Sequence, residues 1–96
     1  MIGITRKSEY VYYYEKLILE ITEDIAELMS KKNISESELA KAIGKDKEYI
    51  TRLLGGNLEP SVGMLVKIFA VFDSEMEISI VPQTESVNVF EQIERN

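Results

Sequence analysis

Apolar residues recur at steps of three and four along the first third of the chain, from Tyr14 to Met29. This spacing places their side chains on one side of an α-helix. The stripe comprises Tyr14, Leu17, Ile18, Ile21, Ile25, Leu28 and Met29. Lys31 and Lys32 suit the negative end of a helix, and Asn33 can close one in a left-handed turn. The pattern therefore predicts a long N-terminal helix that ends near Lys32 and buries this stripe.

A shorter helix is expected directly after it. Residues 35–38 read SESE, the pattern of a capping box in which the Glu38 side chain reaches back to the backbone N–H of Ser35. Gly44 stands where a residue with positive φ would end the helix. The predicted buried positions of this helix are Leu39, Ala40 and Ile43.

Two more helices are predicted in the second half of the chain. Asp46 is a good N-cap for the first of them, and the glycine pair at 55–56 followed by Asn57 ends it. Pro60 and Ser61 open the next one. The inward residues of these two helices are Ile50, Leu53, Leu54, Leu65, Ile68, Phe69 and Phe72. Together the four helices predict a small all-α bundle.

Residues 76–81 (MEISIV) alternate apolar and polar side chains up to Val81, and Pro82 follows. This is the pattern of a β-strand. One strand needs a partner, from this chain or from a second copy. We therefore expect residues 1–82 to form the all-α domain with one C-terminal strand that pairs across a homodimer. Residues 83–96 are expected to be an acidic tail that is weakly ordered or depends on a partner.

Composition narrows the function. Ninety-six residues suffice for one domain. The sequence has no Cys and no His, which excludes disulfides, thiol and imidazole catalysis, and thiolate or imidazole metal ligands. It shows no signal-peptide pattern and no run of the roughly 20 apolar residues that a membrane helix needs. We expect a cytoplasmic protein that is not an enzyme, with no catalytic residues, metal or cofactor and no membrane partner.

The formal net charge of −6 is unevenly distributed. Residues 1–33 hold five basic and six acidic side chains, residues 34–63 four and five, and residues 64–96 two and six. Net charge governs solubility and steering rather than what one face can touch. The nearly balanced middle of the chain can therefore carry a local positive face.

The two short helices joined through Gly44 have the geometry of a helix-turn-helix. Ala40 is small where the two helices cross, and Gly44 permits the sharp turn. Inward apolar residues attach the pair to the other helices. The outward face of the helix at 47–55 is then free to enter the major groove of DNA.

Residues 34–72, ISESELAKAIGKDKEYITRLLGGNLEPSVGMLVKIFAVF, resemble the Cro- and XRE-type transcriptional regulators, whose fold is lambda-repressor-like. The matching features are Glu-Leu-Ala before the turn, the turn glycine, Ile and Leu in the next helix, a glycine-containing exit, Pro-Ser and an apolar helix. The continuation EMEISIVP is similar to small regulators and HigA-type antitoxins in which a strand follows the last helix. The resemblance implies a sequence-specific transcriptional regulator, in the first instance a repressor that binds a palindromic operator as a homodimer.

The resemblance also implies which residues contact double-stranded DNA. The family's base-reading positions fall on Lys47, Glu48 and Arg52, with Thr51 beside them as a fourth expected base contact. Arg52 can bind a guanine edge with two hydrogen bonds, and Glu48 can accept one from a cytosine amino group. The phosphate backbone is left to Ser35, Ser37, Lys41, Lys45 and Asn57, together with backbone N–H groups.

Three positions depart from the family pattern. Glu36 stands where the family often has a glutamine that binds phosphate, and a carboxylate cannot donate to phosphate. Leu58 and Glu59 replace basic residues that often follow the reading helix. These departures predict modest affinity, fewer phosphate contacts and a shallow dependence on salt.

Other interpretations stay open at this point. The chain can be an antitoxin that neutralises a cognate toxin through its strand or tail and represses its own operon. It can also be a helix-turn-helix scaffold without DNA binding. The tyrosines at 10 and 12–14 can stack on single-stranded nucleic acid, although core and dimer packing explains them better. The acidic side chains at 20, 23, 24 and 27 fit a solvated helix face better than a cation site.

Overall fold

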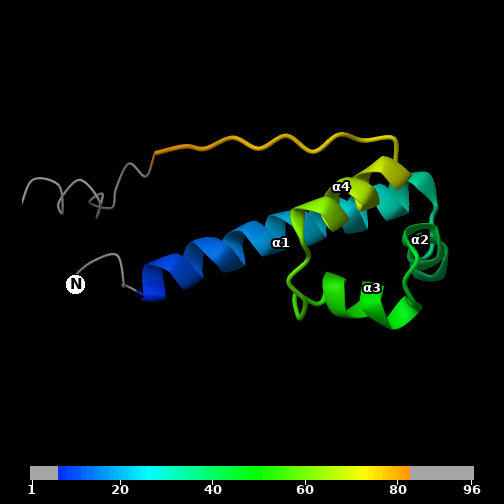
Figure 1. Ribbon diagram of the computed structural model, residues 1–96, viewed down its shortest axis with the longest axis horizontal. Coiled ribbons are helices and arrows are strands. Elements are labelled where there is room, and N and C mark those ends of the chain that lie inside the picture. The colour runs from blue at the N-terminus through cyan, green and yellow to red at the C-terminus, as the bar shows by residue number, and fades with distance from the viewer. Residues whose placement is uncertain (1–6, 83–96) are drawn as a thin grey trace, which may run out of the picture.

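The computed structural model describes residues 7–82, which form four helices in chain order (Figure 1). Their bounds are α1 Lys7–Lys32, α2 Glu36–Ile43, α3 Lys47–Leu54 and α4 Val62–Val71. The predicted all-α character is confirmed. The helix predicted at 47–55 ends at Leu54, one residue earlier, because Gly55 is its C-cap.

The predicted capping signals fix the ends of the short helices. The backbone N–H of Ser35 donates to Glu38 Oε1 at 2.9 Å, and the backbone N–H of Glu38 donates to Ser35 Oγ at 3.1 Å. The side chains of Asp46 and Ser61 accept backbone N–H groups of α3 and α4 in the same manner. Each such cap stabilises its helix by about 1 kcal/mol. The three short helices, α2, α3 and α4, therefore begin where the sequence indicated.

A single apolar core joins the four helices. Each large side chain buried in it contributes about 1.5–3 kcal/mol. Its members are Ile25, Met29, Leu39, Ala40, Ile43, Ile50, Leu53, Leu65, Ile68, Phe69 and Phe72. Because α2 and α3 both contribute to this core, the helix pair is held rigidly against α1 and α4.

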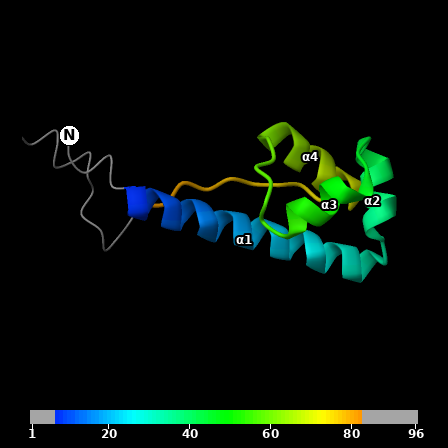
Figure 2. The same ribbon diagram turned by 90° about the horizontal axis from the view of Figure 1, so that it is seen from below.

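The first helix is much longer than the bundle that it supports. α1 has 26 residues and is about 39 Å long, whereas α2 and α3 have 8 residues each. Its N-terminal half projects past the other helices (Figure 2). The predicted burial of the stripe is therefore wrong at Tyr14 and Leu17, which are 38% and 54% exposed. None of the helices within residues 7–82 combines the length and apolar character that crossing a membrane demands.

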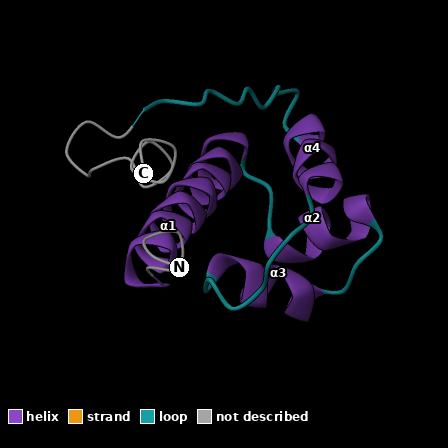
Figure 3. Cartoon of the chain, turned by 60° about the vertical axis from the view of Figure 1, so that its left-hand side comes forward, coloured by secondary structure: helices purple, strands orange, loops and turns teal. Residues whose placement is uncertain are grey.

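The strand predicted at 76–81 is not a strand in the single chain. After α4 the chain runs back along α1 as an extended segment, residues 74–82 (Figures 1 and 3). It forms no β-ladder with any other part of residues 7–82, because its neighbours are helices whose backbone groups are already bonded. Ile78 and Ile80 are 67% and 88% exposed. The predicted tail at 83–96 lies outside the described residues.

Candidate nucleic-acid interface

The turn between α2 and α3 is fixed by its backbone. Gly44 has φ 76°, a left-handed conformation that favours glycine. The backbone N–H of Lys45 donates to the carbonyl oxygen of Ala40 at 2.8 Å, and Ala40 itself is 2% exposed. This bond closes the C-terminus of α2 and turns the chain into α3, which packs on α2 with one face buried and the other in solvent.

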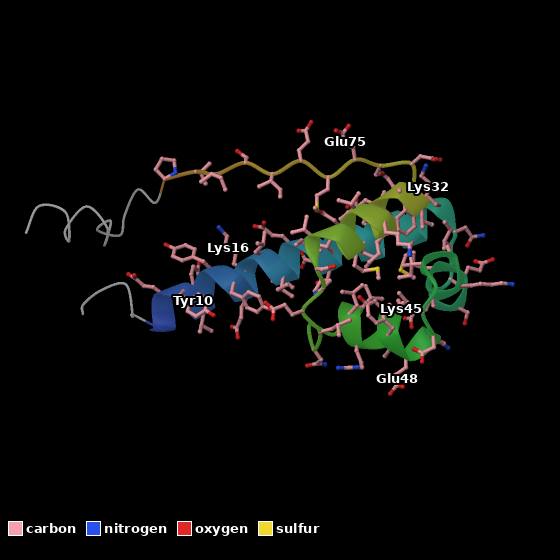
Figure 4. All side chains as sticks on the ribbon, in the orientation of Figure 1. Tyr10, Lys16, Lys32, Lys45, Glu48 and Glu75 are labelled. Carbon is pink, nitrogen blue, oxygen red and sulfur yellow. The ribbon has the colours of Figure 1, made fainter. Side chains whose placement is uncertain are left out.

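The four predicted base-contact residues share the outward face of α3. Lys47, Glu48, Thr51 and Arg52 are all exposed, whereas Ile50 and Leu53 are buried. Figure 4 shows Glu48 pointing away from the bundle on the α3 side of the molecule. We call the four exposed residues the α3 face. Within residues 7–82, the side chains at 47, 48 and 52 have no hydrogen-bond or ion-pair partner, so their polar groups are available to a ligand.

The five residues expected to hold the phosphate backbone are also exposed. They lie before, within and after the helix pair, at Ser35, Ser37, Lys41, Lys45 and Asn57. The Ser35 oxygen already accepts the Glu38 backbone N–H, so it can offer a phosphate its hydroxyl proton. All five side chains can donate a hydrogen bond, as contacts to phosphate oxygens require.

Tyr49 belongs to this site although the sequence did not single it out. The Lys45 ammonium lies 5.0 Å from the centroid of the Tyr49 ring, a distance at which a cation is attracted to the ring face. Tyr49 is half-buried and lines a polar hollow beside α3. The hollow is lined by Gly44, Lys45, Asp46, Glu48, Tyr49 and Arg52. The signal that could have found Tyr49 is its place on the helix boundary, between outward Glu48 and inward Ile50.

A hydrogen bond between α2 and α3 was also not predicted. The Thr51 hydroxyl donates to Glu36 Oε1 at 2.9 Å, and the carbonyl oxygen of Lys47 is a second acceptor at 3.2 Å. Glu36, the first residue of α2, thus holds a side chain in the middle of the α3 face. Its presence in place of the family's glutamine has a structural consequence.

Leu58, the second departure, also has a packing role. It is half-buried and packs against the core after the exit from α3. Glu59, next to it, is exposed. An apolar side chain at 58 is therefore explained by burial, and the segment after α3 supplies no basic side chain between Asn57 and Ser61.

The acidic extended segment and the α3 face lie on different sides of the molecule. The extended segment lies on one side of α1 and α3 on the other (Figures 1 and 3). Glu75 on that segment and Glu48 on α3 mark the two opposite sides in Figure 4. Glu75 therefore lies on the side of the molecule opposite the α3 face (Figure 4).

Comparison with known protein families matches the part of the chain that contains the helix pair. A family model described as helix-turn-helix matches residues 25–78, more than half of the sequence. The matched range begins in the C-terminal part of α1 and includes α2, α3 and α4. No curated protein sequence and no solved structure matches the chain.

Proposed function

The chain belongs to the helix-turn-helix family of DNA-binding transcription regulators, and from this premise we propose that it is a cytoplasmic repressor that binds a palindromic operator as a homodimer. In this proposal α3 enters the major groove and the bound dimer blocks a promoter. One observation carries the proposal: the α3 face is exposed and mostly unpartnered, while the rest of α3 is anchored in the core.

Each member of the α3 face has a chemical match among the base edges. The Arg52 guanidinium fits O6 and N7 of guanine, which accept two parallel hydrogen bonds. The Glu48 carboxylate can accept from the amino group of cytosine. Lys47, at the start of α3, can reach a base or a phosphate. Such contacts are worth roughly 1–3 kcal/mol each in discrimination.

The phosphate contacts are few for this kind of protein. Lys41 and Lys45 supply charge, and Ser35, Ser37 and Asn57 supply neutral donors. Because the salt dependence of binding follows the number of phosphates neutralised, we expect a shallow salt dependence and modest affinity. The acidic segment on the opposite side of the molecule adds a repulsion that lowers non-specific binding.

The homodimer is proposed to form through the extended segment. Residues 76–81 carry the alternation of a strand and have no ladder partner within residues 7–82. Ile78 and Ile80 expose large apolar side chains, whose burial against a second copy would stabilise the pair. In this proposal the two α3 helices of the dimer bind half-sites about one helical turn apart.

Selection of binding sites from random duplexes tests the proposal. The full chain is incubated with the duplex pool in moderate salt with competitor DNA, after circular dichroism has verified that it is folded. We expect an inverted repeat whose half-sites are about 10 base pairs apart. Failure to enrich any motif would contradict the proposal and favour a scaffold without DNA binding.

A second candidate function, that of an antitoxin, is favoured by a groove on the other side of the molecule. The groove lies between α1, α4 and the extended segment, and apolar side chains such as Leu17, Ile21 and Phe69 line it. Its charged lining residues within the described chain are Glu20, Asp24 and Glu77, all acidic. An apolar segment flanked by Lys or Arg from a basic toxin would match both properties, and it would leave the α3 face open for autorepression.

The antitoxin hypothesis has its own test. The gene next to this one should encode a small basic protein whose toxicity this chain relieves. We expect the double substitution Glu20→Lys with Asp24→Lys to abolish the relief. Glu23→Lys with Glu27→Lys makes the same charge change at exposed α1 positions outside the groove and should preserve it. Equal loss in both variants would count against the groove as the docking site.

A further inference from the structure

The hydroxyl of Thr51 is oriented from within the protein. Thr51 lies in the middle of the α3 face, one position before Arg52, and is exposed. Its Oγ1 donates to Glu36 Oε1 at 2.9 Å and lies 3.2 Å from the carbonyl oxygen of Lys47. Both neighbours are acceptors, so both draw the single hydroxyl proton toward the protein.

This arrangement fixes the hydrogen-bonding character that Thr51 presents to solvent. A hydroxyl has one proton to donate and two lone pairs that accept. An ionised carboxylate has no proton to return, and hydrogen bonds to an ionised acceptor are stronger than those between neutral groups. With its proton held by Glu36, Thr51 offers a ligand an acceptor oxygen and a methyl group.

We propose that Thr51 is a specificity-determining residue that accepts a hydrogen bond from a base amino group, N6 of adenine or N4 of cytosine. The inference rests on the proposed function, in which the α3 face enters the major groove. Guanine N7 and O6 and thymine O4 are acceptors, and an oxygen whose proton is committed cannot bond to them. Glu36 is the positioning residue that sets this polarity.

The same inference explains why Glu36 differs from a glutamine. A glutamine amide can accept through its oxygen or donate through its nitrogen, so either direction of the bond to Thr51 would be available. A carboxylate allows one direction only. With Glu36 in place of glutamine, the chain loses a neutral donor to phosphate. In return, the direction of the hydrogen bond to Thr51, a base-reading position, is fixed.

The test removes single functional groups from the selected duplex and from the protein together. Duplexes are made with purine in place of adenine or 2-pyrimidinone in place of cytosine, which deletes the amino group, and with 7-deazapurines, which delete the N7 acceptor. Each duplex is titrated with the wild type, with Thr51→Val, which removes the hydroxyl at nearly constant shape, and with Thr51→Ser, which keeps it. Coupling in such a cycle isolates the pairwise contact.

We expect one amino-group deletion to weaken binding of the wild type and of Thr51→Ser by about two- to tenfold, the range of a single neutral hydrogen bond. The same deletion should leave binding to Thr51→Val unchanged. Deletions of N7 should weaken the wild type and Thr51→Val by equal factors. Because residue 51 is exposed, the Val variant should remain folded.

Glu36→Gln tests the positioning role. The Gln amide can donate to Oγ1 and so occupy the lone pair meant for the base, and we expect the coupling between Thr51 and the amino group to fall. A structural role alone would weaken binding to all duplexes by one factor and leave the coupling unchanged, which would overturn the role given to Glu36. Glu23→Gln, on α1, is the matched control.

The outcomes separate this inference from the proposed function. If the wild type selects a motif but Thr51 couples to an N7 acceptor, or to no base group, the inference is overturned and the repressor proposal stands. If the wild type selects no motif, the repressor proposal itself fails.

Discussion

Gly44 shows how one backbone position sets the geometry of the helix pair. Its φ of 76° lies in the left-handed region, and a Cβ added there would meet no atom within 4 Å. The cost of a side chain at this position is therefore conformational rather than steric. Gly63 offers a contrast, because it lies within α4 and a Cβ there would meet only Ser61 Oγ, at 3.9 Å.

Alanine at these two glycines should change stability in opposite directions. Gly44→Ala should lower the free energy of unfolding by about 1–2 kcal/mol, the cost of a left-handed conformation for an L-residue. Gly63→Ala should raise it by up to about 1 kcal/mol, since glycine loses more backbone freedom than alanine when a helix forms. Urea denaturation of both variants measures the difference. A shift in the same direction would contradict this explanation of the turn.

At the residue scale, the sequence predicted positions better than pairings. Asp46 and Ser61 were recognisable as caps because capping depends on residues three positions apart. The bond from Thr51 to Glu36 spans 15 positions, and the approach of Lys45 to Tyr49 depends on how the turn directs a flexible side chain. Such contacts follow from the packing of α2 on α3, which local patterns do not specify.

Among the elements, α2 depends most visibly on its capping box. Eight residues are too few for a helix to be stable by itself in water, so its termini and its buried face must hold it. The Glu38 side chain accepts the Ser35 backbone N–H, and this bond is the main cause that holds the pKa of Glu38 below its ordinary value of 4.5. The cap is therefore linked to pH.

The pH dependence of stability should report this cap. A carboxyl whose pKa is lowered by folding stabilises the protein fully above its unfolded pKa and loses that contribution as pH falls through the lowered value. We expect Glu38→Gln, titrated by urea denaturation from about pH 7 to about pH 3, to lose less stability on acidification than the wild type. Glu23→Gln, an exposed acid on α1, should follow the wild type. A Glu38→Gln curve parallel to the wild-type curve would contradict this account.

The sequence predicted the neighbours of an element less well than the element itself. Residues 76–81 alternate as a strand does, but a ladder also needs an edge to pair with, and the described chain has none. Tyr14 and Leu17 belong to a helical stripe, yet they remain 38% and 54% exposed because the helices beside them do not cover them. In both cases the local pattern indicates which side chains share a face, but it does not specify what packs against that face.

For the whole molecule, the extended segment provides a test of the dimer. Ile80 is 88% exposed, so Ile80→Asp should leave the folded chain intact while placing a charge in the proposed interface. We expect light scattering to show a dimer for the wild type and a monomer for this variant at the same concentration. Val66→Asp changes an exposed apolar residue on α4 and should remain dimeric. If the wild type is a monomer at protein concentrations well above its dissociation constant for DNA, the proposed dimer is overturned.

The position of the charges in the molecule explains how an acidic chain can present a positive face to DNA. Glu75 and Glu77 lie on the extended segment, on the side away from α3 (Figure 1), and the α3 face retains Lys47 and Arg52. Binding should therefore depend on where a positive charge lies rather than on how many the chain has. Two pairs of basic residues allow that distinction: one pair on the α3 face, and Lys16 with Lys67 elsewhere.

The most direct measurement compares these pairs by fluorescence anisotropy on a duplex obtained by selection. Lys47→Ala with Arg52→Ala should weaken binding by at least about tenfold, because each contact contributes roughly 1–3 kcal/mol. Lys16→Ala with Lys67→Ala removes the same formal charge and should bind within about twofold of the wild type, the small change expected from long-range screening. Wild-type affinity in the α3 variant, or an equal loss in both variants, would contradict the claim that α3 reads DNA.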